Sequence, residues 1–294
     1  MKYRHVFHAG NFADVHKHVT LLALIRALSR KEKGFLLLDT HAGRGLYDLQ
    51  SEGARKTAES HGGIALLEAA TLEAARHDHW PPEIDDYLAI VKAIRRERSS
   101  RRVYPGSPMI ALAAIRPQDR AVFIETQAEE HAALHRLLSR ESGRIAAECA
   151  DGYQRIRHWL PNSERRALVL IDPPYEDTTA DFRAVEATAC ETLRRLPNAV
   201  VAIWYPIKHE RDTEEWRNRL ISRLPKPPDE ARTPAISSDL WIHPPDSRVG
   251  LNGSGLLILN PPWQLAEQMA NWLPILRELL DTERTGGATV RSLP

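Results

Sequence analysis

Cysteine is scarce in this sequence, and long apolar runs and a strong net charge are missing. The two cysteines, Cys149 and Cys190, are too few for a disulfide framework or a thiolate zinc site. No apolar run approaches the ~18–20 residues of a membrane helix. The polar amino terminus also lacks the apolar stretch of an export signal. We therefore expect a cytoplasmic protein with no membrane partner. A net charge of +1 neither favours nor excludes nucleic acid.

The 294 residues have the composition of a globular protein with a full core, at 43% hydrophobic and 27% charged. Strand-like apolar stretches alternate with helical patterns, which predicts a mostly parallel seven-stranded sheet with helices on both faces. We predict strands at 35–38, 121–124, 144–148, 168–171, 199–204, 236–242 and 255–259. We predict helices at 13–29, 64–72, 84–94, 128–139, 182–196 and 214–220.

Residues 48–102 interrupt this alternation with helical patterns and no convincing strand. We expect a helical insertion there, between a segment 1–47 with the first strand and a remainder 103–294. The negative charge of Asp14 suits the start of the first helix. Gly34 is expected to end this helix in the C′ position. Ser107 is expected to cap a helix that has Pro108 in its first turn.

The most informative stretch is the predicted strand 168–171, followed by Asp172-Pro173-Pro174-Tyr175. Two prolines stop a strand abruptly, so Asp172 and Tyr175 belong at its carboxyl end, where open α/β sheets bind ligands. The Asp172 carboxylate and the Pro173 carbonyl can accept hydrogen bonds from an exocyclic amine, and Tyr175 can stack on the ring. The corner resembles that of amino-group methyltransferases acting on adenine N6 or cytosine N4. By itself, it could equally be a proline turn with a capping aspartate.

A glycine-rich turn follows the first strand, as Asp39-Thr40-His41-Ala42-Gly43-Arg44-Gly45. It resembles the first methyltransferase motif, with His41 where a first glycine is usual. A nicotinamide-binding turn is the rival, but Asp48 occupies its third glycine position. Glu125 ends the second strand of the alternation, where a carboxylate can accept from ribose hydroxyls. Asp151 follows the next strand and could accept from an adenine amine, although Asp151-Gly152 is also an ordinary turn.

Three other features have competing interpretations. His5, His8, His16 and His18 suggest a metal site, but the usual companion ligands are missing and we expect no metal. The run 92–102 has six cations and one carboxylate, and is either a solvated helix face or a phosphate-contacting patch. Asn260-Pro261-Pro262-Trp263 is a second possible catalytic corner, but only 31 residues follow it. Asp172 is the better candidate, with Asn260 left as a candidate for the substrate side.

Together, these stretches resemble the RlmJ family of bacterial large-subunit ribosomal RNA adenine-N6 methyltransferases. The resemblance is carried by Tyr-Arg-His-x-Phe-His-Ala-Gly-Asn-x-Ala-Asp-Val-x-Lys-His at 3–18 and Leu-Asp-Thr-His-Ala-Gly at 38–43. It continues through Tyr-Pro-Gly-Ser-Pro at 104–108, Ala-Asp-Gly-Tyr-Gln at 150–154 and Leu-Ile-Asp-Pro-Pro-Tyr-Glu at 170–176. Trp-Tyr-Pro at 204–206 and Asn-Pro-Pro-Trp at 260–263 extend it over nearly the whole chain.

The resemblance implies a Rossmann-like class I fold that uses S-adenosylmethionine. It implies a catalytic Asp172, and Tyr3 on the RNA side. It also implies cofactor contacts at His18, His41, Ser107, Glu125, Asp151 and Gly152, to which the glycine turn adds Gly43 and the corner adds Asp172. For the phosphate-contacting patch we expect RNA contacts at Arg95, Arg96, Arg101 and Arg102.

From the sequence we expect a monomer that methylates adenine N6 in 23S ribosomal RNA, either protein-free or early in assembly. Two alternatives remain. One is a DNA adenine methyltransferase, which would share the corner but should carry a DNA-reading domain. The other is a non-enzymatic RNA-binding or ribosome-assembly factor, in which the cofactor positions should be eroded.

Overall fold

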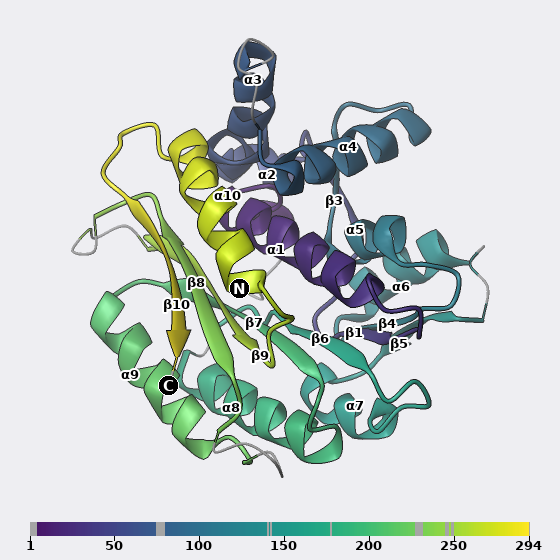
Figure 1. The fold of residues 1–294 in the computed structure, drawn as a ribbon. Helices are drawn as coiled ribbons and strands as arrows, with labels where there is room; N and C mark the ends of the chain where they lie inside the picture. The colour runs from purple at the N-terminus through teal and green to yellow at the C-terminus, as the bar shows by residue number, and fades with distance from the viewer. Residues whose placement is uncertain are drawn as a thin grey trace.

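The computed structural model describes residues 5–74, 80–139, 141, 143–176, 178–226, 232–244, 247 and 250–293. Its centre is an eight-stranded sheet in the order β10-β8-β9-β7-β6-β1-β4-β5 (Figure 1). The strands from β7 to β5 run parallel, whereas β9, β8 and β10 join antiparallel beside β7. The strands are β1 Leu36–Asp39, β4 Arg120–Glu125, β5 Ile145–Cys149, β6 Ala167–Ile171, β7 Val200–Ile207, β8 Ala235–Trp241, β9 Gly253–Leu259 and β10 Gly287–Leu293. A separate two-stranded ribbon pairs β2 Leu46–Asp48 with β3 Val103–Pro105.

Helices cover both faces of the sheet (Figure 1). One face carries α1 Phe12–Ser29, α5 Ser107–Ala114, α6 Ala128–Leu138 and α10 Leu265–Leu280. The other carries α7 Gly152–Trp159, α8 Thr178–Arg195 and α9 Glu210–Arg223. Residues 48–102 hold α2 Glu52–Thr57, the 3-10 helix η2 Glu59–Gly62, α3 Ile64–Ala74 and α4 Pro82–Glu97, and a short 3-10 helix η1 His5–Phe7 precedes α1. No helix in these described ranges is long and apolar enough to span a membrane.

The central strands are apolar without alternation because each faces a core on both sides. Leu37 and Leu168 point into the core under α1, whereas Leu38 and Val169 point into the core under α8. All five residues of β6 are buried. Burying both faces fixes the register of β6, and with it the position at which the chain emerges as Asp172.

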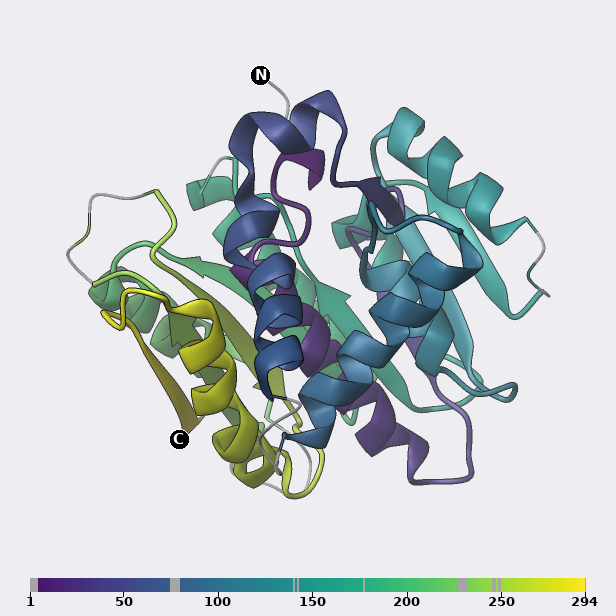
Figure 2. The same ribbon diagram turned by 90° about the horizontal axis from the view of Figure 1, so that it is seen from above.

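Helix α1 is buried from Phe12 to Ile25. It packs against α4, α5 and α10, and in the view from above α3 and α4 lie over it (Figure 2). A helix covered on all sides is normally apolar on all sides. Asp14, Lys17 and two histidines of α1 therefore lie inside the protein and need polar partners there.

The structure confirms Asp14 in the first turn of α1 and the helix end at Ser29, and it differs from the predicted caps at Gly34 and Ser107. Helix α1 is capped by Asn11, whose Oδ1 accepts the N–H of Asp14 at 2.9 Å, and it ends at Ser29, well before Gly34. Gly34 is needed for space, because a Cβ there would lie 2.2 Å from the Gln118 carbonyl oxygen. Helix α5 is capped by Gly106 rather than Ser107, whose hydroxyl is used elsewhere.

The sheet has one strand more than the seven predicted. Strand β10 was not predicted because its residues are half-buried or exposed and include no apolar run.

Asn260 also differs from its expected place. It follows β9, which is antiparallel to β7, so it lies at the opposite edge of the sheet from Asp172. Its amide nitrogen donates to the carbonyls of Pro197 and Ala199, both at 2.8 Å.

Candidate active site

Two cavities meet at the edge where β1, β4 and β6 end. The smaller, which we call the glycine-turn cavity, has a volume of about 90 Å³ and is lined by residues that include His18, His41, Gly43, Ser107 and Glu125. The larger, which we call the large cavity, has a volume of about 680 Å³ and is lined by residues of η1, α1, η2 and the segment after β8. Both are lined by His5, Lys17, Asp172 and Pro174. A molecule in one cavity would therefore meet a molecule in the other beside Asp172.

Glu125 lines the glycine-turn cavity at the end of β4. Its carboxylate accepts the N–H of Gly43 at 2.8 Å and the N–H of Gln127 at 2.7 Å. Burial raises the pKa of this carboxyl, although these backbone donors oppose the shift. Gly43 has φ +62°, and a Cβ there would lie 2.2 Å from the Tyr47 hydroxyl. The position therefore requires glycine, and Glu125 holds the turn in place.

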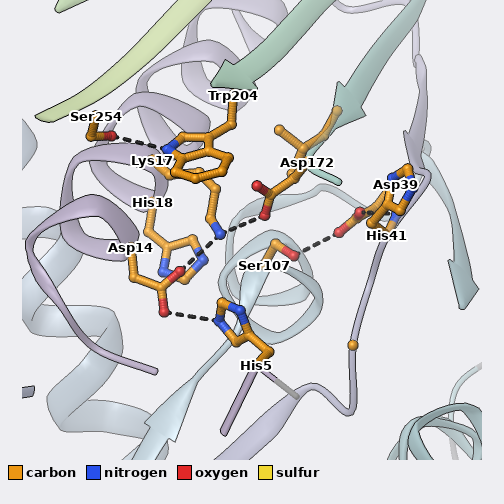
Figure 3. Close-up of polar contacts among 12 residues, drawn as sticks. His5, Asp14, Lys17, His18, Asp39, His41, Ser107, Asp172, Trp204 and Ser254 are labelled. Atoms are coloured by element: carbon orange, nitrogen blue, oxygen red, sulfur yellow. Dashed lines mark hydrogen bonds and ion pairs between the residues drawn. The ribbon is translucent and has the colours of Figure 1, made fainter. Parts of the chain in front are cut away.

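Asp39 does not line this cavity but is hydrogen-bonded to two residues that do, Ser107 and His41 (Figure 3). Its Oδ2 accepts from the Ser107 hydroxyl at 2.7 Å, and its Oδ1 from the His41 N–H at 3.2 Å. Burial raises the pKa of Asp39 to about 7, and the nearby charge of Asp172 adds to the rise. Burial also lowers the pKa of His41 to about 3, so this ring is neutral at physiological pH.

Lys17 connects Asp172 to the amino-terminal segment (Figure 3). Its Nζ lies 2.5 Å from Oδ2 of Asp172 and 2.8 Å from Oδ1 of Asp14. Oδ2 of Asp14 is bonded to Nε2 of His5 at 3.0 Å and to the Gly10 N–H at 3.0 Å. Burial favours the neutral amine, but the two carboxylates outweigh it and raise the pKa of Lys17. Lys17 is therefore a buried cation that fixes one oxygen of Asp172.

Sequence reasoning missed Lys17. The signals were a lysine flanked by apolar residues and histidines inside a helix, and Asp14 three positions before it. Long charged side chains are almost never fully buried unless they are paired. A fully buried helix was not evident from sequence because α4, α5 and α10, which cover it, lie far along the chain.

His18 lines the glycine-turn cavity from α1. Its Nδ1 is hydrogen-bonded to the Tyr104 hydroxyl at 2.9 Å, and that hydroxyl lies 3.0 Å from the Tyr87 hydroxyl. Burial lowers the pKa of His18 to about 3. A neutral ring held from behind can present its other face or nitrogen to a bound ligand.

Tyr175 does not lie where the stacking role would put it. It has φ +51°, is 5% exposed, and donates its hydroxyl proton to the Trp204 carbonyl at 2.7 Å. Its ring packs on Phe182, with a centroid distance of 4.7 Å. The left-handed backbone after the two prolines turns the ring into the core. Trp204, by contrast, lines the large cavity.

Asp151 and Gly152 lie beside the glycine-turn cavity. Asp151 caps α7, accepting from the N–H groups of Tyr153 at 2.9 Å and Gln154 at 3.4 Å. A Cβ on Gly152 would lie 2.0 Å from the Thr40 carbonyl oxygen, so only glycine allows this approach. Neither residue lines one of the two cavities. Tyr153 meets the His41 ring edge-on at a centroid distance of 4.7 Å, which links α7 to the cavity wall.

The predicted basic patch divides in two. Arg95 is half-buried, forms an ion pair with Glu68 and donates from Nε to the Val103 carbonyl at 2.8 Å. Expecting it to contact RNA was therefore wrong, because its guanidinium ties α4 to α3 and β3. Arg96, Arg101 and Arg102 are exposed at the surface. Tyr3 lies outside the described residues.

Within the described ranges, no three histidine, cysteine, aspartate or glutamate side chains are grouped so that they could hold a metal ion.

The sequence is similar to known proteins over nearly its whole length. A sequence model of the family described as "Ribosomal RNA large subunit methyltransferase D, RlmJ" matches residues 32–293. Ribosomal RNA large subunit methyltransferase J of Escherichia coli K12 is 39% identical over 292 residues, covering 99% of this chain and 98% of that protein. The protein of the same name from Haemophilus influenzae is 36% identical over the same shares of the two chains.

A crystal structure of a Legionella pneumophila protein superimposes with a TM-score of 0.83 at 27% identity. It covers 97% of this chain and 98% of that chain. The similarity therefore extends over the whole fold. The chain belongs to the RlmJ family of ribosomal RNA large subunit methyltransferases.

Proposed function

We propose that this protein transfers a methyl group from S-adenosylmethionine to N6 of an adenine in 23S ribosomal RNA. The observation that carries the proposal is the position of Asp172 and its proline corner, between the two cavities and held by Lys17. One cavity then takes the methyl donor and the other the base that receives the methyl group. The proposed substrate places the enzyme in the cytoplasm, where ribosomes are assembled.

The glycine-turn cavity fits S-adenosylmethionine by the chemistry of its walls. Glu125 offers a buried carboxylate to ribose hydroxyls at the end of β4, and Gly43 leaves backbone uncovered by a side chain. His18, His41 and Ser107 add neutral polar groups. Asp151 and Gly152 flank this cavity, where they would face the adenine of the donor. When bound there, the donor supplies an activated methyl group.

The residues at the junction then orient the target amine. Oδ2 of Asp172 is engaged by Lys17, which leaves Oδ1 and the Pro173 carbonyl to accept the two N–H bonds of the amine. Fixing the amine by both protons aims its nitrogen, which is the main contribution expected from positioning. The nitrogen loses one proton on methylation, and Asp172 is placed to accept it. The base must leave its stack first, which costs least in single-stranded RNA.

The remaining contacts with RNA belong to surfaces around this junction. Arg96, Arg101 and Arg102 would contact phosphates, and Tyr3, two positions before His5 in the chain, would lie on the RNA side.

We propose that the enzyme acts as a monomer on protein-free or early-assembly RNA. A finished subunit would stack or cover most of its adenines.

The test is transfer of labelled methyl from S-adenosylmethionine to protein-free 23S RNA, intact large subunits and duplex DNA, followed by nucleoside analysis. N6-methyladenosine in the free RNA supports the proposal, with Asp172→Ala as the inactive control. Label in DNA alone would identify a DNA adenine methyltransferase. Absence of both cofactor binding and label would favour an RNA-binding assembly factor.

A further inference from the structure

Trp204 is the one residue of β7 that is not fully buried. In the parallel register Ile171 pairs with Ile203, so Asp172 and Trp204 follow side by side at the same edge of the sheet. Figure 3 shows the indole next to the Asp172 carboxylate, on the side of Lys17. Trp204 also lines the large cavity, so its indole is a wall of the space that faces Asp172.

The orientation of this indole is fixed from behind by a chain of hydrogen bonds. Nε1 of Trp204 donates to the Ser254 hydroxyl at 3.0 Å, and Nδ1 of His16 lies 3.0 Å from the same hydroxyl. Nε2 of His16 is bonded in turn to the Ser238 hydroxyl at 2.9 Å. His16 is fully buried, and burial lowers its pKa to about 3, so no charge disturbs the chain. A large ring held this way loses little freedom when a ligand binds.

The aromatic residue of the proline corner cannot fill this role in the same arrangement. The Tyr175 hydroxyl is tied to the Trp204 backbone and its ring is in the core. Tyr175 therefore supports Trp204 from inside the sheet. Phe12 also borders the large cavity, but it belongs to the core beneath α1 and is 7% exposed. A base whose amine reaches Asp172 needs an aromatic face in the large cavity, and Trp204 provides it.

We propose that Trp204 is the surface on which the target adenine lies, and that Ser254 and His16 are positioning residues that set the plane of its indole. The ligand class is an unstacked purine nucleotide of single-stranded RNA. The inference rests on the proposed function, because it names the base-binding part of the same site. Stacking of a base on an aromatic side chain is largely independent of sequence, so Trp204 would contribute to affinity while Asp172 selects the amine.

The experiment compares Trp204→Leu with Trp263→Leu in the full-length protein. Trp263 is a matched control, because it is 79% exposed and follows β9 at the opposite edge of the sheet. We expect Trp204→Leu to raise KM for 23S RNA roughly five- to hundredfold, as removal of one stacking platform does. Affinity for S-adenosylmethionine should not change. Trp204→Phe, which keeps an aromatic face, should recover most of the affinity, and Trp263→Leu should behave as wild type.

Ser254→Ala tests the positioning chain separately. It leaves the indole in place but removes the acceptor of its N–H, so we expect a smaller rise in KM, of about two- to fivefold. Thermal unfolding of each variant shows whether the fold is kept. An unchanged KM in a folded Trp204→Leu protein would overturn the proposal.

A binding experiment separates this proposal from the proposed function. Adenosine monophosphate is titrated with S-adenosylhomocysteine at saturation, so that the glycine-turn cavity is filled, and tryptophan fluorescence is followed. Quenching in the wild type and in Trp263→Leu, but not in Trp204→Leu, supports Trp204 as the base-binding surface even if no RNA is methylated. Equal quenching in all three proteins, or none in the wild type, would overturn it.

Discussion

Nζ of Lys17 lies 2.5 Å from Oδ2 of Asp172, although 155 positions separate the two residues in the chain. The ion pair joins the first long helix to the end of β6. It engages one oxygen of Asp172 and leaves the other for the amine in the proposed reaction.

Asp172→Ala should abolish nearly all methyl transfer, because the amine loses its main acceptor. Binding of S-adenosylmethionine should survive, since the glycine-turn cavity keeps its other walls. Single-turnover methylation of 23S RNA measures the first effect and calorimetry the second. If activity stayed within about tenfold of wild type, a change of only ~1.4 kcal/mol in the barrier, the role assigned to Asp172 would be wrong.

Lys17→Met should lower the free energy of unfolding by about 3–5 kcal/mol, because it leaves the buried Asp14 carboxylate without its cation. Urea denaturation at neutral pH measures the change. Lys56→Met is the matched control, since Lys56 pairs with Glu52 on the surface and both are mostly exposed. An equal effect of the two substitutions would contradict a buried charge network.

Asp39 should make stability depend on pH with an unusual sign. Its pKa is raised to about 7 in the folded protein, so between about pH 4 and 7 the folded state holds a proton that the unfolded state has released. Its contribution to stability therefore falls as pH rises through this window. Asp39→Asn removes the titration, so the stability of this variant relative to wild type should increase from pH 4 to pH 7. Urea midpoints of both proteins at several pH values check the sign, and a difference independent of pH would refute it.

Gly43→Ala should weaken S-adenosylmethionine binding. The new Cβ would collide with the Tyr47 hydroxyl, and alanine is strained at φ +62° by about 1–2 kcal/mol. The turn must shift, and with it the N–H bonded to Glu125. Isothermal titration with S-adenosylhomocysteine measures the drop in affinity. Gly143→Ala, where a Cβ would meet nothing within 4 Å, should bind as wild type.

The arginines in the last turn of α4 and just after it should differ in function from one another. Alanine at Arg96, Arg101 or Arg102 should weaken RNA binding and reduce the slope of log affinity against log salt by about one for each phosphate that is no longer neutralised. Arg95→Ala should instead lower the unfolding free energy, because its side chain bonds Glu68 and Val103. Filter binding across a salt series and urea denaturation distinguish the two outcomes. A lower salt slope in Arg95→Ala with unchanged stability would reverse the assignment.

Much of the fold follows from local pattern. The run 168–171 predicted a central strand because burial on both faces requires four consecutive apolar residues, and the two prolines fixed where it stops. The carboxylates Asp39, Glu125 and Asp172 were predicted at strand ends because each directly follows such an apolar run. Strand β10 was missed because an edge strand needs no apolar pattern.

The site was less predictable because its decisive interactions are long-range. No sequence pattern around Lys17 indicates that Asp172 is its partner. Likewise, no pattern around Trp204 indicates that Ser254 and His16 fix its indole. The orientation of Tyr175 depends on a left-handed backbone, which residue type does not reveal for tyrosine. Ser107 was predicted to cap α5, but its hydroxyl instead donates to Asp39, which lies 68 positions away.

The burial of α1 has a consequence for how the protein matures during synthesis. Helix α1 leaves the ribosome early, but α10, which packs on it, and Ser254, which bonds its His16, are made late. Without them, α1 lacks the cover of α10, and the Trp204 N–H lacks its Ser254 acceptor. The glycine turn and the proline corner are therefore both synthesised before the residues that complete the site around them.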